Sequence, residues 1–418
     1  MKRVLGLLLA LALLCPAGAM AEKFVPALDT ETECLIRVVG TYSNFESLEA
    51  EFDRFNDYYP NVELTYTKLD NYSGVITLAL MGEEAPNIFC SSAWMLGSDK
   101  FDEMFGMAEN LADPALNLDL DCIQDGMLYW NEQGEAPLVP VFCNTFGMLV
   151  NMDIFSRLKL NVPTTYSELL SVCEALKQAG YASPIMGFNS ESHLSYCFAY
   201  PHYMAYLREH PETVDRLNAM EPGAADFMRP TLEMVQDFMS RGYVDLEACG
   251  ALENNYNAVL LRFLEGDVPM MAVSADTSSG SKKREAQSEA FTANPFDYRF
   301  FVIPTTEEGG YFLKVAQLQF SVNAGCQNLD MTNEFMRFLI STEELSEIAQ
   351  AKRLVTVTED MSFDSVYASL GQIPEERTVY ERAVGLLDDT NIQLRRLAYQ
   401  VVSGLMTVDE ALAAFGSL

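Results

Sequence analysis

The 418-residue sequence has few of the side chains that most often hold metals or contact nucleic acids. It contains three histidines and two tryptophans, and its 27 lysines and arginines are outnumbered by 60 aspartates and glutamates. There is no HExxH pattern and no CxxC pair, so we expect no metal site and no cofactor. The formal net charge of −33 argues against nucleic acid as a partner, because phosphates are neutralised by basic surfaces.

The sequence also lacks the Gly-x-Ser-x-Gly elbow of serine hydrolases. Its many carboxylates leave one enzymatic alternative open, an exported carboxylate-dependent glycoside hydrolase. Such enzymes hold two carboxyl groups about 5–5.5 Å or about 6.5–9.5 Å apart, a distance that the order of residues does not reveal. We therefore keep this enzyme class as an alternative to a binding protein without catalytic activity.

The N-terminus, residues 1–21, has the pattern of a secretory signal peptide. Lys2 and Arg3 form its basic start, Val4–Leu14 its apolar run, and Ala19–Ala21 a cleavage site of the small-residue type. No later apolar run reaches the roughly 18 residues of a membrane helix. We expect an exported protein, extracellular or periplasmic. A lipid anchor on Cys15 at the cell surface is the alternative.

Length and composition indicate a globular protein of two lobes or domains. The chain is too long for one typical domain, and it is 49% hydrophobic and 21% charged, which is typical of a protein with a core. Eight cysteines follow Cys15, and in an exported chain they permit disulfides. Several lie in apolar contexts where cysteine behaves as a small hydrophobic residue, so no particular pair is predicted.

The stretch Pro137–Phe155 is the feature around which the chain is organised. Two apolar runs, Leu138–Phe142 and Phe146–Val150, are interrupted by the small polar group Cys143-Asn144-Thr145. Two buried strands joined without a turn are expected where a chain passes from one lobe to another. These residues alone fit a strand pair within one domain equally well.

The N-terminal part alternates strands and helices. Strands are predicted at Leu35–Gly40, Val62–Tyr66 and Asn87–Cys90, with helices between them over Phe45–Tyr59 and Tyr72–Met81. This order is typical of an open parallel sheet covered by helices, where ligands bind beyond the carboxyl ends of the strands. Helix capping is the alternative role of the serines in this set. The residues expected on that rim are Ser43, Asn44, Ser91, Ser92 and Trp94.

Four further stretches carry a recognisable pattern: Asn161–Ile185, Glu265–Val273, Ser321–Glu344 and Thr407–Leu412. The first is a threonine-capped, leucine-rich helix followed by a proline-isoleucine strand, and the second contains glutamate-glycine-x-x-x-methionine. The third is an extended run followed by a phenylalanine-rich helix. In this order they resemble the extracellular solute-binding proteins of ABC-type importers, in the family that includes maltodextrin- and other sugar-binding proteins.

The resemblance implies a two-lobed α/β fold, the periplasmic-binding-protein fold of type II. Each lobe would be an open, mainly parallel sheet flanked by helices, with the ligand cleft between the lobes and closure by a hinge motion. Crossings between the lobes are expected near Val141–Thr145, Asp267–Met271 and Gln317–Ser321. The implied division is residues 33–143 plus 270–318 for lobe 1, and 144–269 plus 319–418 for lobe 2.

The resemblance also implies ligand contacts by position. Asn144 directly follows the first crossing, and a second-lobe loop and a C-terminal segment match stretches that reach the cleft. Where many sugar-binding members have glycine-x-tryptophan, this chain has Ser274-Ala275-Asp276. In addition to the five rim residues above, the predicted ligand-binding residues are Asn144, Asn189, His193, Ser274, Asp276 and Asn391.

The resulting prediction is a monomeric solute-binding protein rather than an enzyme. It would capture a small polar solute, a sugar or oligosaccharide, and deliver it to the membrane permease of an ABC-type importer. Asp276 stands where tryptophan would stack on a sugar ring, so a cationic solute such as a polyamine is an alternative ligand. A scaffold or sensory protein built from the same two lobes is the third possibility.

Overall fold

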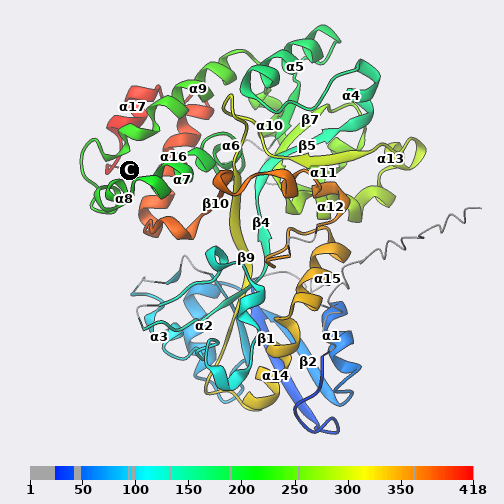
Figure 1. The fold of residues 1–418 in the computed structure, drawn as a ribbon, viewed down its shortest axis with the longest axis vertical. Coiled ribbons are helices and arrows are strands. Elements are labelled where there is room, and N and C mark those ends of the chain that lie inside the picture. The colour runs from blue at the N-terminus through cyan, green and yellow to red at the C-terminus, as the bar shows by residue number, and fades with distance from the viewer. Residues whose placement is uncertain are drawn as a thin grey trace, which may run out of the picture.

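The computed structural model describes residues 24–41, 49–92, 95–96, 99–131, 133–187, 191–252, 255–360 and 363–417. The predicted signal peptide and Cys15 lie outside these ranges. Two lobes stand one above the other and are joined by extended strands (Figure 1). None of the helices in the described ranges is long and apolar enough to cross a membrane.

The first lobe begins with the predicted alternation of strands and helices. Strand β1 pairs in parallel with both β2 and β3. The apolar stripe of α1 explains its position, because Phe55 is fully buried and its ring meets that of Phe335 edge-on at 5.2 Å. The elements are β1 (Cys34–Gly40), α1 (Glu49–Asn56), β2 (Val62–Lys68), α2 (Tyr72–Leu80), β3 (Ile88–Ser91) and α3 (Asp102–Phe105).

Later segments of the chain complete this lobe. Strand β9 (Phe312–Val322) runs antiparallel between β3 and β4 (Val139–Asn144). The start of β9 pairs in parallel with β10 (Thr378–Tyr380), and there Leu313 and Val379 are buried in the core of the second lobe. Two further helices, α14 (Leu329–Leu339) and α15 (Thr342–Lys352), pack beside α1.

A buried ion network fastens α1 to α15. The carboxylate of Glu51 is fully buried and lies 3.2 Å from Arg54 and 3.3 Å from Lys352. Glu344 extends the network to Arg54, with a nitrogen–oxygen distance of 2.6 Å. A buried carboxylate needs such partners, since desolvation alone would strongly disfavour its charge.

The second lobe contains a four-stranded sheet in the order β6-β7-β5-β8. Only β6 and β7 are parallel, while β5 runs antiparallel to β7 and β8. The predicted α/β fold with two lobes is thus confirmed, with two mixed sheets, because β9 runs antiparallel to β3 and β4 in the first sheet and β5 antiparallel to its neighbours in the second. Its strands are β5 (Phe146–Asn151), β6 (Ile185–Gly187), β7 (Met270–Ser274) and β8 (Tyr298–Phe301).

Helices surround this second sheet, and two of them begin as the sequence predicts. The Thr165 hydroxyl accepts the amide of Glu168 at 3.2 Å, and Thr407 and Glu410 form a reciprocal capping box. The helices are α4 (Met152–Leu158), α5 (Tyr166–Gln178), α6 (Glu191–Phe198), α7 (Tyr200–Glu209), α8 (Pro211–Asn218), α9 (Arg229–Ser240), α10 (Leu246–Leu252), α11 (Tyr256–Leu264), α12 (Asp276–Arg284), α13 (Glu289–Ala293), α16 (Asp388–Val402) and α17 (Val408–Ala413).

The strand pairing differs from the expected division of the chain. Strand β7 does not cross to the first lobe near Asp267–Met271, because it pairs with β5, with Val273 opposite Gly147. Strand β8 also lies in the second sheet, whereas α14 packs on α1 of the first lobe. A short buried run has the same apolar pattern in either sheet, so the local sequence does not reveal its pairing partner. We therefore propose that 270–301 belongs to lobe 2 and 319–352 to lobe 1.

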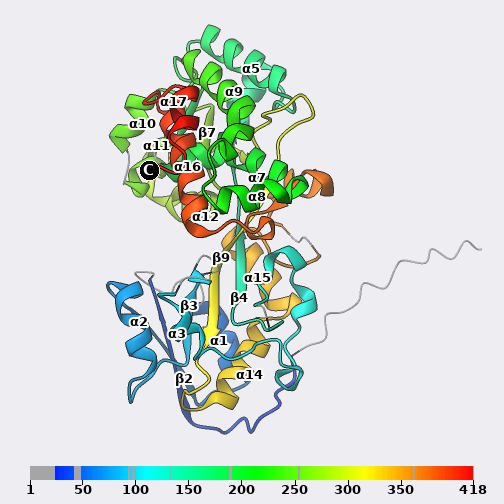
Figure 2. The same ribbon diagram turned by 90° about the vertical axis from the view of Figure 1, so that its left-hand side faces the viewer.

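The stretch Pro137–Phe155 does pass from one sheet to the other. It forms β4 in the first sheet and, after Thr145, β5 in the second. Strand β9 runs antiparallel beside β4, and the amide of Cys143 donates to the carbonyl of Val355 at 2.9 Å, which places a third segment alongside. Figure 2 shows β4 and β9 side by side between the lobes. In the middle of β9 three consecutive residues, 315–317, are only half-buried, as expected for a span between two cores.

Candidate functional site

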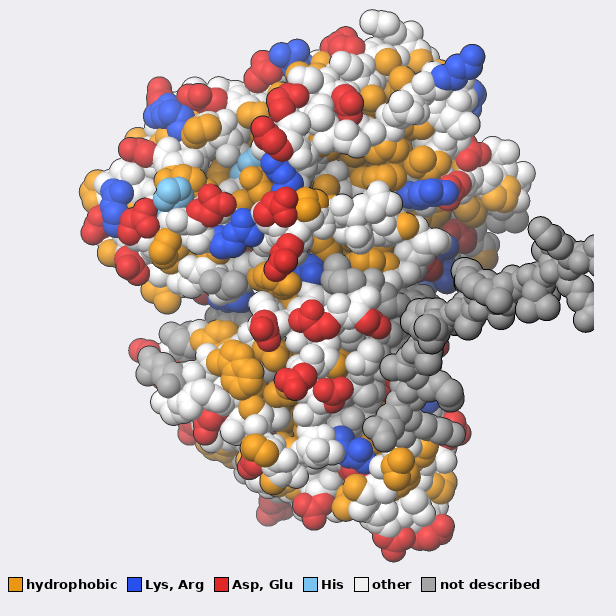
Figure 3. Space-filling model, in the orientation of Figure 1, with side chains coloured by type: hydrophobic (Ala, Val, Ile, Leu, Met, Phe, Trp, Pro, Cys, Tyr) orange, Lys and Arg blue, Asp and Glu red, His pale blue; other side chains and the backbone are white. Residues whose placement is uncertain are grey.

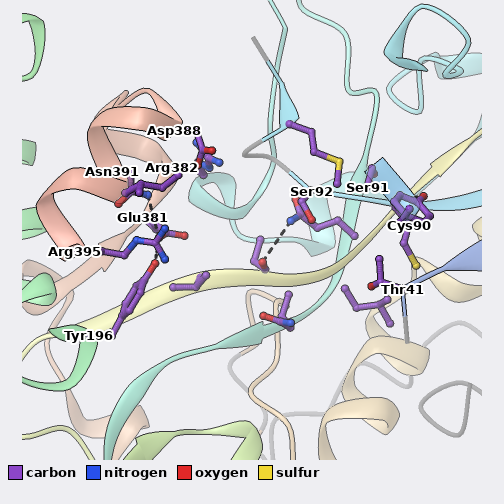
Figure 4. Close-up of a pocket in the computed structure, with 18 residues that line it drawn as sticks. Thr41, Cys90, Ser91, Ser92, Tyr196, Glu381, Arg382, Asp388, Asn391 and Arg395 are labelled. Carbon is purple, nitrogen blue, oxygen red and sulfur yellow. Dashed lines mark hydrogen bonds between the residues drawn. The ribbon is translucent and has the colours of Figure 1, made fainter. Parts of the chain in front are cut away.

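A cavity of about 510 Å³ lies between the lobes, with β9 as its floor. The first lobe contributes Thr41, Tyr72, Cys90, Ser91, Ser92 and Met95, and the second lobe Tyr196, Glu381, Arg382, Asp388, Asn391, Ile392 and Arg395. The floor consists of Val315, Ala316, Gln317, Leu318 and Gln319. In Figure 4 the labelled second-lobe side chains lie at the left and the labelled first-lobe side chains at the right, with β9 running from one set toward the other, and Figure 3 shows the surface notched between the lobes.

The first-lobe wall is polar but uncharged. It is built where β3 ends, as expected for the carboxyl end of a parallel strand. The Ser91 and Ser321 hydroxyls are 2.8 Å apart, and the Tyr72 hydroxyl donates to the carbonyl of Cys90. Burial raises the pKa of the Cys90 thiol to about 12, so it stays neutral. This wall is therefore lined by hydroxyl groups and a neutral thiol and carries no charged side chain.

One face of α16 forms much of the second-lobe wall. Its cavity-lining residues are Asp388, Asn391, Ile392 and Arg395, at positions i, i+3, i+4 and i+7. Residues with this spacing share one face of a helix. The helix thus presents a carboxylate, an amide, an apolar group and a guanidinium in one row along the cavity.

Glu381 connects this row to two tyrosines. Its Oε1 accepts hydrogen bonds from the hydroxyl of Tyr196 at 2.8 Å and of Tyr200 at 3.3 Å, and from the Asn391 amide at 3.5 Å. Burial, together with the charge of Glu381, raises the pKa of both tyrosines well above the usual value. Both hydroxyls consequently stay protonated and act as donors, which fixes the carboxylate of Glu381 in place.

The charges on the second-lobe wall are balanced in number. The guanidinium of Arg395 lies over the ring of Tyr196, 5.5 Å from its centroid, and Arg382 makes no ion pair within the described residues. Burial raises the pKa of Asp388, while the nearby Arg382 and Arg395 act in the opposite direction. Two guanidiniums and two carboxylates supply directed donors and acceptors without a net charge.

Three of the predicted site residues line this cavity, namely Ser91, Ser92 and Asn391. They come from both lobes, although Ser91 and Asn391 are almost fully buried and bonded to neighbouring side chains. Ser43, Asn44, Trp94 and Asn189 lie outside the residues that the structure describes.

A second group of predicted residues gathers at the crossing instead of on the cavity wall. The carbonyl oxygen of the Asn144 side chain accepts the amides of Thr145 at 3.0 Å and Asp276 at 3.3 Å. The Ser274 hydroxyl donates to the carboxylate of Asp276. These bonds tie β4 to the start of α12. A ligand contact by Asn144, Ser274 or Asp276 stays a prediction.

The predicted contact His193 is half-buried near this second group. Its ring lies edge-on to Phe146 at 6.4 Å, and Phe146 in turn stacks on Tyr196 at 4.3 Å. Burial lowers the pKa of His193, and the charge of Asp276 partly opposes this. The imidazole is therefore neutral at physiological pH.

Several lining residues were not predicted from the sequence. They are Tyr72, Tyr196, Gln317, Gln319, Glu381, Arg382 and Arg395. Arg395 could have been found from its helical spacing to Asn391, whereas nothing in the local sequence marks the glutamines of β9. Among the described residues, no group of three or more His, Cys, Asp or Glu side chains is arranged to hold a metal ion.

Two α/β lobes that enclose a cavity of ligand size define a two-lobed binding protein. The chain belongs to the bacterial extracellular solute-binding protein family, whose family model matches residues 40–345. This confirms the resemblance seen in the sequence. Members of this family are transport receptors and not enzymes, which excludes the glycoside hydrolase.

Solved structures agree with this fold at low sequence identity. RafE of Streptococcus pneumoniae, in complex with raffinose, is 17% identical, with a TM-score of 0.70 over 91% of this chain and 98% of its own. A Bacillus licheniformis sugar transporter protein in complex with stachyose is 12% identical, with a TM-score of 0.60 over 90% and 97%. The sugar-binding protein MalE of Xanthomonas citri is 13% identical, with a TM-score of 0.67 over 90% and 94%. A comparison with curated protein sequences gives no significant match.

Proposed function

We propose that this protein binds a sugar or short oligosaccharide between its lobes and delivers it to the permease of an ABC-type importer. The observation that carries the proposal is the cavity itself, which has uncharged hydroxyls on one wall and a charge-balanced set of donors and acceptors on the other. Its volume of about 510 Å³ is within the usual range for small-molecule sites. The fold-level likeness to proteins solved with raffinose and stachyose supports the same class of ligand.

Delivery would use the hinge formed by β4 and β9. Closure of the lobes would bring the hydroxyl wall toward α16 and enclose the solute, as in other two-lobed receptors. The permease is proposed from family membership, since importers of this kind receive their solute from such a receptor. An exported location, with either a free or a lipid-anchored N-terminus, is part of the same proposal.

A cationic solute such as a polyamine is the second candidate. The observation that favours it is Asp388, a cavity-lining carboxylate whose pKa burial raises and which a ligand cation would stabilise. Arg382 and Arg395 on the same wall argue against a polyamine, because their guanidiniums would repel the further positive charges of such a ligand. We therefore rank the saccharide first.

A thermal-shift screen followed by calorimetry tests the proposal. Saccharides from disaccharides to pentasaccharides are compared with polyols and polyamines. A ligand at 100-fold excess over its Kd stabilises the native state by about 2.7 kcal/mol, which is measurable. A saccharide that raises the melting temperature and binds with micromolar or better Kd is the expected result. Binding of polyamines alone would favour the second candidate, and no binding in either class would refute both.

A further inference from the structure

Strand β9 departs from regular strand geometry at one residue of the cavity floor. The backbone of Leu318 has a φ of +43°, in the left-handed region that residues with a side chain rarely adopt. Its neighbours Gln317 and Gln319 keep one common register opposite Phe142 and Pro140, so no extra residue has been inserted to cause the distortion. An ordinary leucine is thus held in an unfavourable conformation in the middle of a strand ladder.

The next residue carries a second unfavourable feature. Gln319 is only 5% exposed, and its side-chain carbonyl oxygen Oε1 has no hydrogen-bond partner within the described part of the chain. Its amide nitrogen makes one long bond, 3.4 Å, to the carbonyl of Ala316. A buried acceptor without a partner is unfavourable, and buried polar groups in native proteins are nearly always bonded.

Both features lie at the same point of the molecule. Leu318 and Gln319 line the floor of the cavity, on the strand that connects the lobes. Strained backbone of this kind clusters at active sites, ligand clamps and switch regions, where the strain is part of the mechanism. A ligand that fills the cavity would lie where it can both bond to Gln319 and change the backbone conformation of Leu318.

We propose that Gln319 determines the specificity of the cavity by accepting a hydrogen bond from the solute, and that Leu318 positions it. When the solute binds, the backbone of Leu318 leaves the left-handed region for the extended one, and this rotation turns the buried Oε1 of Gln319 into the cavity. The inference rests on the proposed function and deepens it. It requires a solute with a hydroxyl or N–H donor at the cavity floor, and it predicts rejection of analogues that lack this donor.

The decisive measurement compares Leu318→Gly with Leu318→Ala. Both variants lack the side chain beyond Cβ, but only alanine is disfavoured in the left-handed region. Calorimetry uses the tightest wild-type binder among raffinose, stachyose, maltotriose, xylotriose and chitotriose. If binding releases the left-handed backbone, the glycine variant binds more weakly than the alanine variant by about 5- to 150-fold, the equivalent of about 1–3 kcal/mol.

A matched pair of variants serves as the control. Lys159 has a φ of +56° at the end of α4 and does not line the cavity. Lys159→Gly should melt at a higher temperature than Lys159→Ala, with equal Kd values. Leu318→Gly should likewise melt above Leu318→Ala without ligand, which verifies independently that the ligand-free protein holds the left-handed backbone.

A second pair tests the acceptor. Gln319→Met keeps the length of the side chain and removes the amide, and we expect at least a 10-fold rise in Kd. Gln372→Met, at an exposed position outside the cavity, should bind as the wild type does.

The outcomes separate this inference from the proposed function. Equal Kd values for the two Leu318 variants, or wild-type affinity of Gln319→Met, would overturn the inference while saccharide binding by the wild type upholds the function. If no saccharide of the screen, from disaccharides to pentasaccharides, binds the wild-type protein, the proposed function fails, and the inference that rests on it fails as well.

Discussion

Replacing Glu381 with alanine should loosen the second-lobe wall of the cavity. The carboxylate accepts one short bond, from Tyr196 at 2.8 Å, and two longer ones, from Tyr200 and Asn391 at 3.3 and 3.5 Å. Tyr200 would keep Asn391 as a partner, whereas Tyr196 would lose a charged acceptor inside the protein. A hydrogen bond to a charged group contributes about 1.5–3 kcal/mol, and longer bonds contribute less.

The total loss of stability in Glu381→Ala is therefore about 2–4 kcal/mol. An unfolding entropy of about 2.1 cal/mol/K per residue amounts to about 0.8 kcal/mol/K for roughly 400 residues. The melting temperature should fall by about 2–5 °C. Differential scanning calorimetry of the ligand-free protein measures this directly.

Two comparisons make the result interpretable. Glu381→Gln retains one oxygen as an acceptor but removes the charge, so it should lose less stability than Glu381→Ala. Glu376→Ala removes an exposed carboxylate from the same part of the chain and should leave the melting temperature unchanged. If Glu381→Ala melts within 1 °C of Glu376→Ala, the reasoning that Glu381 holds the wall together is refuted.

Three further predictions concern other parts of the molecule. Arg395→Gln should raise the Kd of a bound saccharide about 10-fold or more in calorimetry. Arg396→Gln changes the next residue of the same helix, which does not line the cavity, and should leave the Kd unchanged. Equal effects of the two substitutions would exclude a specific contact between Arg395 and the saccharide. Burial lowers the pKa of His202 to about 4, so the unfolded chain binds a proton that the native state does not, and stability should fall as pH drops from about 6.5 to about 4. His202→Gln should flatten that part of a melting-temperature profile, and an unchanged slope would contradict the assignment. Glu51→Gln should cost about 3 kcal/mol by chemical denaturation, because it breaks the buried network between α1 and α15, whereas the exposed Glu49→Gln should cost almost nothing.

Hydrophobic periodicity and capping residues predicted the elements of the N-terminal part and several later helices and strands. The strands and helices from Cys34 to Ser91, helix α5 with its Thr165 cap and the terminal helix α17 are where the pattern places them. Local rules suffice there, because each element is specified by residues within one or two turns of itself. The extension of β9 toward Phe312 and the short strand β10 have weaker local signals.

The pairing of strands depended on information that the local sequence does not contain. Strand β7 was expected to return to the first lobe, yet it pairs with β5 within the second sheet. Its run of Met, Ala and Val is fully buried and would suit either sheet, so only the global arrangement decides.

The cavity was predictable in location but only partly in composition. Ser91 and Ser92 were expected because they follow a parallel strand, and Asn391 because the family resemblance reaches that segment. Glu381 could not be expected in the same way, and Gln319 was expected only within the Gln317–Ser321 crossing, not as a lining residue. Each reaches the cavity through the crossing of distant segments, and neither lies in a local pattern that marks a binding residue.

The position of β9 in the first sheet has a consequence for how the protein is made. This strand lies between β3 and β4, yet it follows all four strands of the second-lobe sheet in the chain and is synthesised after them. The sheet of the first lobe therefore cannot be completed until the chain has been synthesised as far as Val322. Until then β3 has an unpaired edge. Contacts this far apart in sequence form slowly, and an open strand edge invites aggregation. Folding of this binding protein should depend on the chain being kept unfolded or shielded until its last third has been synthesised.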